Sequence, residues 1–355
     1  MPYQADDYAD LVTTTLRALE KTTWADIVVD NQSHIALPRI LKKKAVQFGS
    51  GYGYQFNVRL FSNNAARNVK LAETDNPTTA DTQKTGNIPW RHTETHWSLE
   101  ERVIAMNRSP ARLVNLLQTS RVDAMTDLAE LMESNFWSKP TSSSDSLAPY
   151  GVPYWINTTS YSTTGGFNGG RPTGFTDVGG LDPNTYSRWK NWNAQYVNIS
   201  KSDLIRKWRE AATKTEFKPP VDGPFSNMKS NWGYYTDYTV LGTLEEVLES
   251  QNDNLGNDVA SKDGATIFRR IPVEWVPYFD NNSGTGDTTN PIYGINWAVF
   301  KPCFLQGEYM KETKVQPHPY QHRTMVQYTD CTMNFCCVDR RRGGLVLSKL
   351  SDLTF

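Results

Sequence analysis

The chain has 355 residues, with 37 basic and 38 acidic side chains and a formal net charge of -1. This length suggests two domains, or one large domain with insertions. Aromatic residues make up 12% and hydrophobic residues 38% of the chain, which excludes a disordered protein, because such a chain cannot bury enough apolar surface to offset its ordering entropy.

The mean hydropathy of -0.58 and the lack of a run of about 18 apolar residues exclude a membrane span. The polar, acidic N-terminus predicts no secretory signal. The balanced charge gives no general reason to expect tight binding to nucleic acid.

The first elements predicted along the chain are a helix and a two-stranded arm. Apolar spacings of three and four predict an amphipathic helix over residues 5–21, and strict alternation predicts a strand over residues 54–60. After a polar stretch, residues 87–97 form a second extended segment that contains Pro89 and is typical of an edge strand. A lone hairpin is marginal in water, so we expect the arm to lie on another surface through its apolar row, Tyr54, Phe56, Val58 and Leu60, with Ile88 and Trp90 on the second strand.

The strongest helix signal begins at Ser109-Pro110 and ends near Trp137, a length of roughly 40 Å. Ser98 and Glu101 predict an earlier helix start through a capping box. Further helices are predicted near residues 185–196 and 200–216, and one is predicted to begin at Thr243. Strands are predicted at residues 271–279, 292–305, 324–338 and 345–347, with residues 340–344 as a turn.

Few residues have a pattern that indicates chemistry. His92, Glu94 and His96 share one strand face and could converge on a metal ion, but an exposed polar face explains them better. The four cysteines, at positions 303, 331, 336 and 337, are expected to be buried thiols in a reducing compartment. The basic runs 42–44 and 340–342 are interpreted as solvated turns in preference to phosphate contacts. We therefore assign no catalytic residue, no cofactor and no metal.

The order of the elements is more informative than any motif. A short N-terminal helix, a protruding two-stranded arm, a long helix, a mixed middle and returning strands resemble the major capsid proteins of tailed bacteriophages, which have the Hong Kong 97 fold. The strings Pro149–Trp155 and Tyr186–Trp192 and the closing hairpin Val338–Leu347 also look like phage capsid sequences. The resemblance covers nearly the whole chain.

This resemblance implies an α+β fold with five parts. Residues 1–45 would be an N-arm, 46–97 an extended loop (E-loop), and 98–184 a peripheral domain that contains the long spine helix and inserted loops. Residues 185–300 would be an axial domain, and 301–355 would return as strands to the peripheral domain.

It also implies a structural role, without enzymatic activity, in an icosahedral phage head around double-stranded DNA. The chain would form hexamers and pentamers, with the arm's apolar row on a neighbouring subunit. It would be assembled in the host bacterial cytoplasm, alongside a portal protein. Only about 45 residues precede the arm, so the resemblance implies a separate scaffolding protein or none; decoration proteins are a further possible partner, and no membrane is involved.

Two other classes remain as alternatives. The abundance of Trp and Tyr would suit a carbohydrate-active enzyme or lectin with an aromatic cleft, although no pair of facing carboxylates can be picked out from the sequence. A phage tail-tube or neck protein would also polymerise, but the long predicted helix argues against it.

Overall fold

The computed structural model describes residues 35–40, 47–74, 79–106, 110–159, 163–216, 231–249, 266–281 and 289–350. The helix predicted over residues 5–21 and the basic run 42–44 lie outside these residues. No helix in this described part is both long enough and apolar enough to cross a bilayer.

A six-stranded sheet is organised around one long strand, β14 (Thr324–Cys337). β4 (Arg91–Glu100) pairs antiparallel with it over ten residues, from Thr324↔Glu100 to Met333↔Arg91. The remaining strands are β1 (Gln47–Gly49), β11 (Phe300–Leu305), β12 (Lys311–Glu312) and β13 (Gln316–Pro317).

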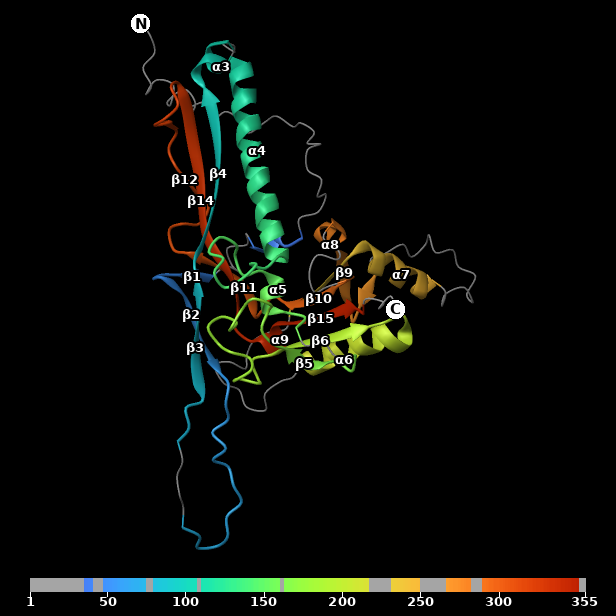
Figure 1. Cartoon of the computed structure of the whole chain (residues 1–355). Helices are drawn as coiled ribbons and strands as arrows, with labels where there is room; N and C mark the ends of the chain where they lie inside the picture. Colours follow the sequence, from blue (N-terminus) through green and yellow to red (C-terminus); the bar gives the residue numbers. More distant parts are fainter. Residues whose placement is uncertain are drawn as a thin grey trace.

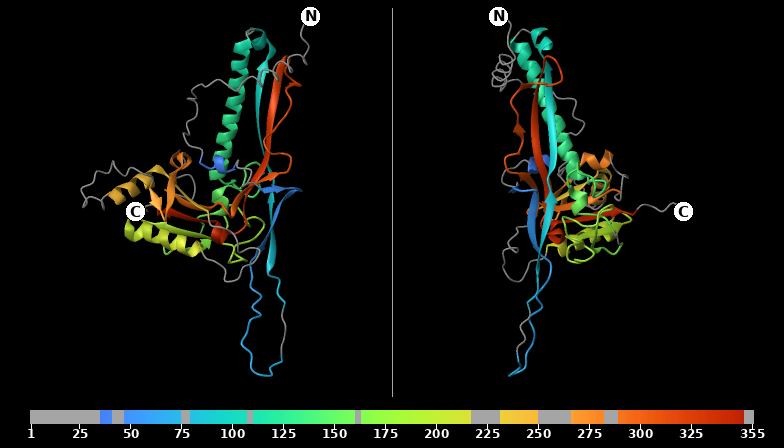
Figure 2. Two further views of the ribbon diagram at one scale, coloured as in Figure 1. Left: turned by 180° about the vertical axis from the view of Figure 1, so that it is seen from behind. Right: turned by 60° about the vertical axis from the view of Figure 1, so that its left-hand side comes forward.

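The helix α4 (Pro110–Trp137) lies along the ribbon formed by β4 and β14, as both figures show (Figures 1 and 2). Trp97 and Leu99 of β4 form a buried cluster with Leu117 and Ala124 of α4. The short helix α3 (Glu101–Met106) connects β4 toward α4.

A seven-stranded sheet lies to one side of this helix and ribbon, with the strand order β5-β6-β15-β10-β7-β9-β8 (Figure 1). Its strands are β5 (Gly166–Gly169), β6 (Asn191–Tyr196), β7 (Trp232–Thr236), β8 (Ile267–Phe268), β9 (Ile271–Trp275), β10 (Ile292–Asn296) and β15 (Gly344–Lys349).

The other helical elements are mostly short and belong to this region. They are α2 (Leu37–Ile40), α5 (Val152–Trp155), the π-helical turn Lys201–Ile205 that continues into α6 (Arg206–Thr215), α7 (Tyr238–Glu249), α8 (Pro277–Asn281) and α9 (Arg340–Gly343). Trp208 and Ala211 of α6 pack on one face of the seven-stranded sheet, in one cluster with Tyr234. The opposite face contributes Tyr235 and Tyr293 to the largest core, which also contains Phe136 and Trp137 of α4.

The third sheet is the arm, the two-stranded pair β2 (Gly53–Arg59) and β3 (Gln83–Pro89). It projects away from the rest of the molecule at the end opposite α3 (Figures 1 and 2).

Several predicted elements are confirmed: the strand at 54–60, the helix ending at Trp137, the helix at 200–216 and the long strand beginning at Thr324. The helix predicted at 185–196 is wrong, because residues 191–196 form β6, in which polar and apolar residues alternate from Asn191 to Tyr196 as expected of a strand. The strand predicted at 292–305 is two strands, β10 and β11, which belong to different sheets.

Two predicted helix starts and one loop also differ. α7 begins at Tyr238 rather than at Thr243, because the Asp237 carboxylate accepts a hydrogen bond from the Val240 amide (3.4 Å) as an N-cap. Ser98 lies inside β4 and caps no helix. Residues 340–343 form α9, and Arg340 and Arg342 are buried, so the solvated-turn interpretation of this run is wrong.

Candidate functional site: the projecting arm and its anchor

The outer part of the arm contacts little of its own chain. Every described residue from 61 to 74 and from 79 to 81 is exposed. Two large apolar side chains in this part face solvent, Leu71 at 102% and Val69 at 61% exposure, while Phe61 is 42% exposed and its ring meets that of Tyr186 edge to face (5.6 Å). Scattered exposed apolar residues are common on protein surfaces; what sets this part apart is that all of its described residues are exposed, so it has no core of its own.

The inner part of the arm is built into the core. Phe56 is 6% exposed and its ring stacks on Trp189 (6.0 Å between centroids) and meets Trp155 edge to face (6.3 Å). The backbone amide of Asn87 donates a hydrogen bond to the Gly179 carbonyl (3.0 Å). The root of the arm is therefore held by side-chain packing and by the backbone.

Gly86 is the point of closest approach between the arm and its anchor. A Cβ atom at this position would lie 2.4 Å from the Phe56 ring and 2.8 Å from the Gly179 carbonyl oxygen. No side chain larger than hydrogen fits there without displacing β3. Glycine at position 86 thus allows the arm to dock tightly.

The two tryptophans under Phe56 are themselves held by Arg340, which is 0% exposed. Its guanidinium donates hydrogen bonds to the carbonyl oxygens of Trp155 (2.8 Å) and Trp189 (2.7 Å). A third short bond goes to Oδ1 of Asn191 (2.9 Å), and longer ones go to the carbonyls of Gly170 (3.2 Å) and Gly169 (3.4 Å).

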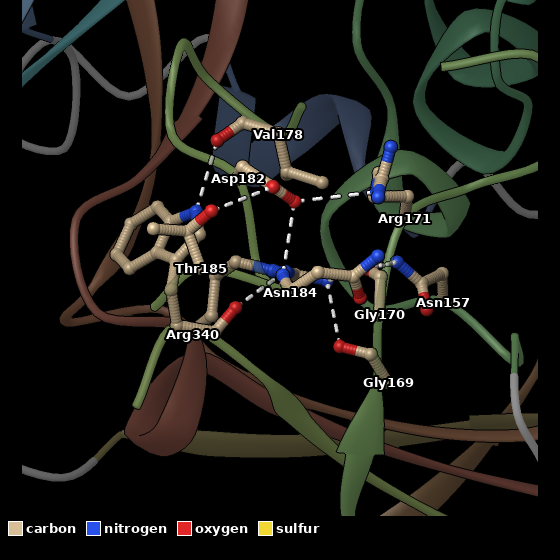
Figure 3. A network of polar contacts seen from close by, with 10 residues as sticks. Asn157, Gly169, Gly170, Arg171, Val178, Asp182, Asn184, Thr185 and Arg340 are labelled. Carbon is tan, nitrogen blue, oxygen red and sulfur yellow. Dashed lines mark hydrogen bonds and ion pairs between the residues drawn. The ribbon is translucent and has the colours of Figure 1, made fainter. Parts of the chain in front are cut away.

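This network continues outward through Asn157, whose amide donates to the Gly170 carbonyl, and through the Arg171–Asp182 ion pair (3.2 Å) (Figure 3). Burial lowers the pKa of Arg340 to about 10, so its side chain remains a cation at neutral pH. All five hydrogen-bond acceptors of the guanidinium are neutral carbonyl oxygens. Arg340 thus joins α9, α5, β5 and β6 beneath the root of the arm.

The structure divides the six predicted arm residues into two groups. Phe56, Leu60 and Ile88 are buried in the chain's own core at 6%, 3% and 0% exposure. Tyr54, Val58 and Trp90 are partly buried against the same cluster. The surface that this apolar row covers is therefore largely its own chain, and contact of these residues with a neighbouring subunit stays a prediction.

Sequence reasoning missed Arg340 and the exposed outer apolar residues. Nothing local distinguishes Arg340 from its neighbours Arg341 and Arg342, because its partners lie at residues 155–191. Phe61, Val69 and Leu71 are isolated apolar residues in a polar stretch and have no periodicity that would mark them.

The described residues show no catalytic constellation. They contain no group of three or more His, Cys, Asp or Glu side chains that could hold a metal ion, and His92, Glu94 and His96 are exposed on β4. The four cysteines are free thiols, and all are buried. The carbohydrate-binding alternative would require tryptophans that line an open cleft. Eight of the ten described tryptophans are instead buried.

No protein-family model and no curated protein matches the sequence. Solved structures match over nearly the whole chain. The capsid protein of cyanophage A-1(L) aligns with a TM-score of 0.62 at 13% identity, covering 96% of this chain and 99% of that one. The capsid of a native GTA particle aligns with a TM-score of 0.56 at 10% identity, covering 94% and 96%. The capsid of cyanophage Pam1 aligns with a TM-score of 0.52 at 13% identity, covering 94% and 98%.

The chain therefore has the α+β fold of phage capsid proteins, as the resemblance in its element order implied. The projecting arm, the long helix and the two larger sheets are the parts of this fold in the present chain.

Proposed function

We propose that this chain is a major capsid protein, which assembles with copies of itself into an icosahedral phage head around double-stranded DNA. Its role is structural rather than enzymatic. The observation that carries the proposal is the arm, whose root is fixed in the core while its outer part exposes Phe61, Val69 and Leu71. Agreement in fold with capsid subunits over 94–96% of the chain supports the same function.

The mechanism follows from how the arm is anchored. Packing around Phe56 and the Arg340 network fix the direction of the arm, so that it can reach a neighbour without a large loss of conformational entropy. Each subunit would give one arm and receive another, and many modest contacts would add up to a stable shell. Hexamers and pentamers are the oligomers that such a shell requires.

The five-part division stays part of the proposal, with the N-arm at 1–45, the E-loop at 46–97, the peripheral domain at 98–184, the axial domain at 185–300 and the return at 301–355. Two strands refine it. β4, at the end of the proposed E-loop, pairs with β14 in the six-stranded sheet. β15, at the end of the proposed return, pairs with β6 and β10 in the seven-stranded sheet.

The remaining partners follow from the same proposal. The subunit would be assembled in the host bacterial cytoplasm and reside in the virion, with a portal protein at one vertex. Separate scaffolding or decoration proteins would be optional partners, and no membrane would be involved.

Deletion of the outer arm tests this proposal. We would replace Ser62–Asp81 by a short Gly/Ser linker, which the geometry allows because the Leu60 amide and the Thr82 carbonyl are already hydrogen bonded (3.0 Å). The variant should fold, since every described residue removed is exposed. Deleting the whole arm, residues 53–90, would also remove Phe56 and Ile88 from the core and would confuse folding with assembly.

Circular dichroism would report folding, and negative-stain microscopy would report shells. We expect a folded variant without closed shells. Leu71→Ser with Val69→Ser should weaken assembly in the same way, whereas Leu147→Ser, at an 82% exposed residue outside the arm, should not. Closed shells from the deletion variant would show that the arm is not the clamp between subunits.

A further inference from the structure

A second surface stands out because of its charge. It lies around α6 and consists of six basic residues: Arg206, Arg209, Lys214, Arg269, Arg270 and Arg341. We refer to these residues as the basic surface. Across the whole chain basic and acidic residues balance, at 37 and 38. Its acidic neighbours include Glu210, paired with Lys214 (2.5 Å), and Glu216, paired with Arg269 (3.7 Å). Asp203, paired with Lys207 (2.6 Å), and Asp339, paired with Arg342 (3.6 Å), lie beside it and are likewise matched by a cation.

Contacts between elements bring these residues onto one side of the molecule. The ring of Phe268, just before Arg269, stacks on Trp208 of α6 (4.0 Å between centroids). The Arg269 guanidinium donates a hydrogen bond to the Arg209 carbonyl (3.2 Å), which places the β8–β9 turn against α6.

Near the C-terminal end of α6, two cations cover one aromatic pair. Lys214 lies over the Trp192 ring (5.1 Å) and Arg341 over the Phe167 ring (4.1 Å), while the two rings meet edge to face at 5.3 Å. α9, which carries Arg341, also packs against α6 (Figure 1). The basic surface therefore continues from the β8–β9 turn across α6 to α9.

Arg206 and Arg209 are the most available groups. They stand three residues apart on α6, so their side chains lie about 5–6 Å apart at Cβ. Both are exposed, and within the part of the chain that the structure describes neither side chain has an ion pair or hydrogen bond of its own. Two guanidinium groups so placed can contact the same or adjacent anionic groups.

The β8–β9 turn provides an independent argument. Arg269 and Arg270 form its two central positions and both have positive φ, at 49° and 68°. Such two-residue turns favour Asn-Gly, because most side chains disfavour this backbone conformation by about 1–2 kcal/mol per residue. Two arginines in a strained turn, beside two unpaired arginines on α6, indicate that positive charge is needed at this position.

We propose that the basic surface binds the phosphate backbone of double-stranded DNA without sequence preference, and so is the face turned toward the DNA in the assembled shell. The choice of DNA as the anionic ligand rests on the proposed function; the basic surface itself does not. Exposed arginines on two separate segments, α6 and the β8–β9 turn, with the partly buried Arg341 beside them, suit phosphates, which dominate non-specific binding. An interface between copies of the chain would instead be depleted of charge at its centre.

The test is the salt dependence of DNA binding by the unassembled full chain. The probe is a random-sequence 30-base-pair duplex, followed by fluorescence anisotropy between 50 and 200 mM NaCl. Each phosphate contact contributes about -0.9 to the slope of log K against log salt. With four contacts, the wild type should lose about a hundredfold in affinity over this range. Arg206→Gln with Arg209→Gln should reduce the slope by about 1.8.

The matched control is Arg102→Gln with Arg323→Gln, two exposed arginines outside the basic surface (65% and 54% side-chain exposure). This variant should bind DNA as the wild type does. If Arg206→Gln with Arg209→Gln impairs folding, the single variants Arg206→Gln and Arg209→Gln should each reduce the slope by about 0.9.

Equal slopes in wild type, variant and control, or no binding by the wild type, would overturn the inference. A variant that binds DNA normally but no longer oligomerises would identify an interface between copies instead, and would also overturn it. Particle formation is scored separately by microscopy. If the protein forms intact shells but the arginine substitutions do not change DNA binding, only this inference is contradicted. If DNA binding depends on these arginines but no shells form, only the proposed function is contradicted.

Discussion

Replacement of the buried cation Arg340 by methionine tests how the arm is anchored. Arg340→Met keeps most of the side-chain volume but removes the guanidinium and its three short hydrogen bonds, to Trp155, Trp189 and Asn191 (2.7–2.9 Å). A buried acceptor left without a donor costs about 1–3 kcal/mol. Three such acceptors predict a loss of at least about 3 kcal/mol in the free energy of unfolding. This is a large part of the roughly 5–15 kcal/mol that stabilises a typical folded protein.

The assay is urea unfolding of the unassembled full chain, followed by tryptophan fluorescence. Arg340→Lys should recover only part of the loss, because one ammonium group cannot reproduce the planar fork that reaches several carbonyls at once. Arg102→Met, at an exposed arginine 3.6 Å from Glu100, should change the free energy of unfolding by no more than about 0.5 kcal/mol. If the free energy of unfolding of Arg340→Met differs from that of the wild type by less than about 1 kcal/mol, Arg340 does not anchor the arm.

Three further predictions concern other buried contacts. Gly86→Ala should destabilise the fold by about 1–3 kcal/mol through overpacking against Phe56. The control is Gly242→Ala inside α7, whose added Cβ meets nothing within 4 Å and which should stabilise the fold by about 0.5–1 kcal/mol. Equal melting temperatures for the two variants would refute the close approach at Gly86. Glu133→Gln should lower the free energy of unfolding by about 1–3 kcal/mol, because the Glu133 carboxylate accepts hydrogen bonds from the Leu37 amide (2.8 Å) and the Trp137 indole (2.8 Å). Glu130→Gln, one turn away and only partly buried, is the control in the same urea experiment. All four cysteines are buried, so they should resist a thiol reagent at pH 8 until the chain is unfolded. Burial also raises the pKa of the Cys331 thiol to about 11, which keeps it in the unreactive thiol form at that pH; rapid reaction of the native protein would contradict their burial.

Local periodicity accounts for the elements that the sequence predicts well. β2 has one buried face and one exposed face, so its alternation is visible, and α4 shows a regular row that includes Leu117, Ala124 and Leu128, all buried. β6 carries the same signal, because polar and apolar residues alternate from Asn191 to Tyr196, and the helix predicted at 185–196 contradicts it. The polar side chains of this strand are nevertheless buried, since Asn191 and Asn193 donate hydrogen bonds to the Asn157 carbonyl (2.9 and 3.4 Å), which only the folded chain brings close.

The candidate site was predictable only in part, for a related reason. The alternation of Tyr54, Phe56 and Val58 correctly identified a row that must pack against something. It contained no information about the partner, since Trp155 and Trp189 lie far along the chain. Arg340 was missed because a buried cation held by carbonyl groups is defined by backbone positions that only the folded chain brings together.

The central claim is that copies of this chain assemble into closed shells through their arms. The most direct measurement is electron microscopy of the purified full-length protein, with reconstruction of any particles that form. We predict icosahedral shells in which the residues around Leu71, exposed in the single chain, are covered by a neighbouring subunit. A uniform monomer under all assembly conditions, or shells in which this part of the arm contacts no neighbour, would contradict the account.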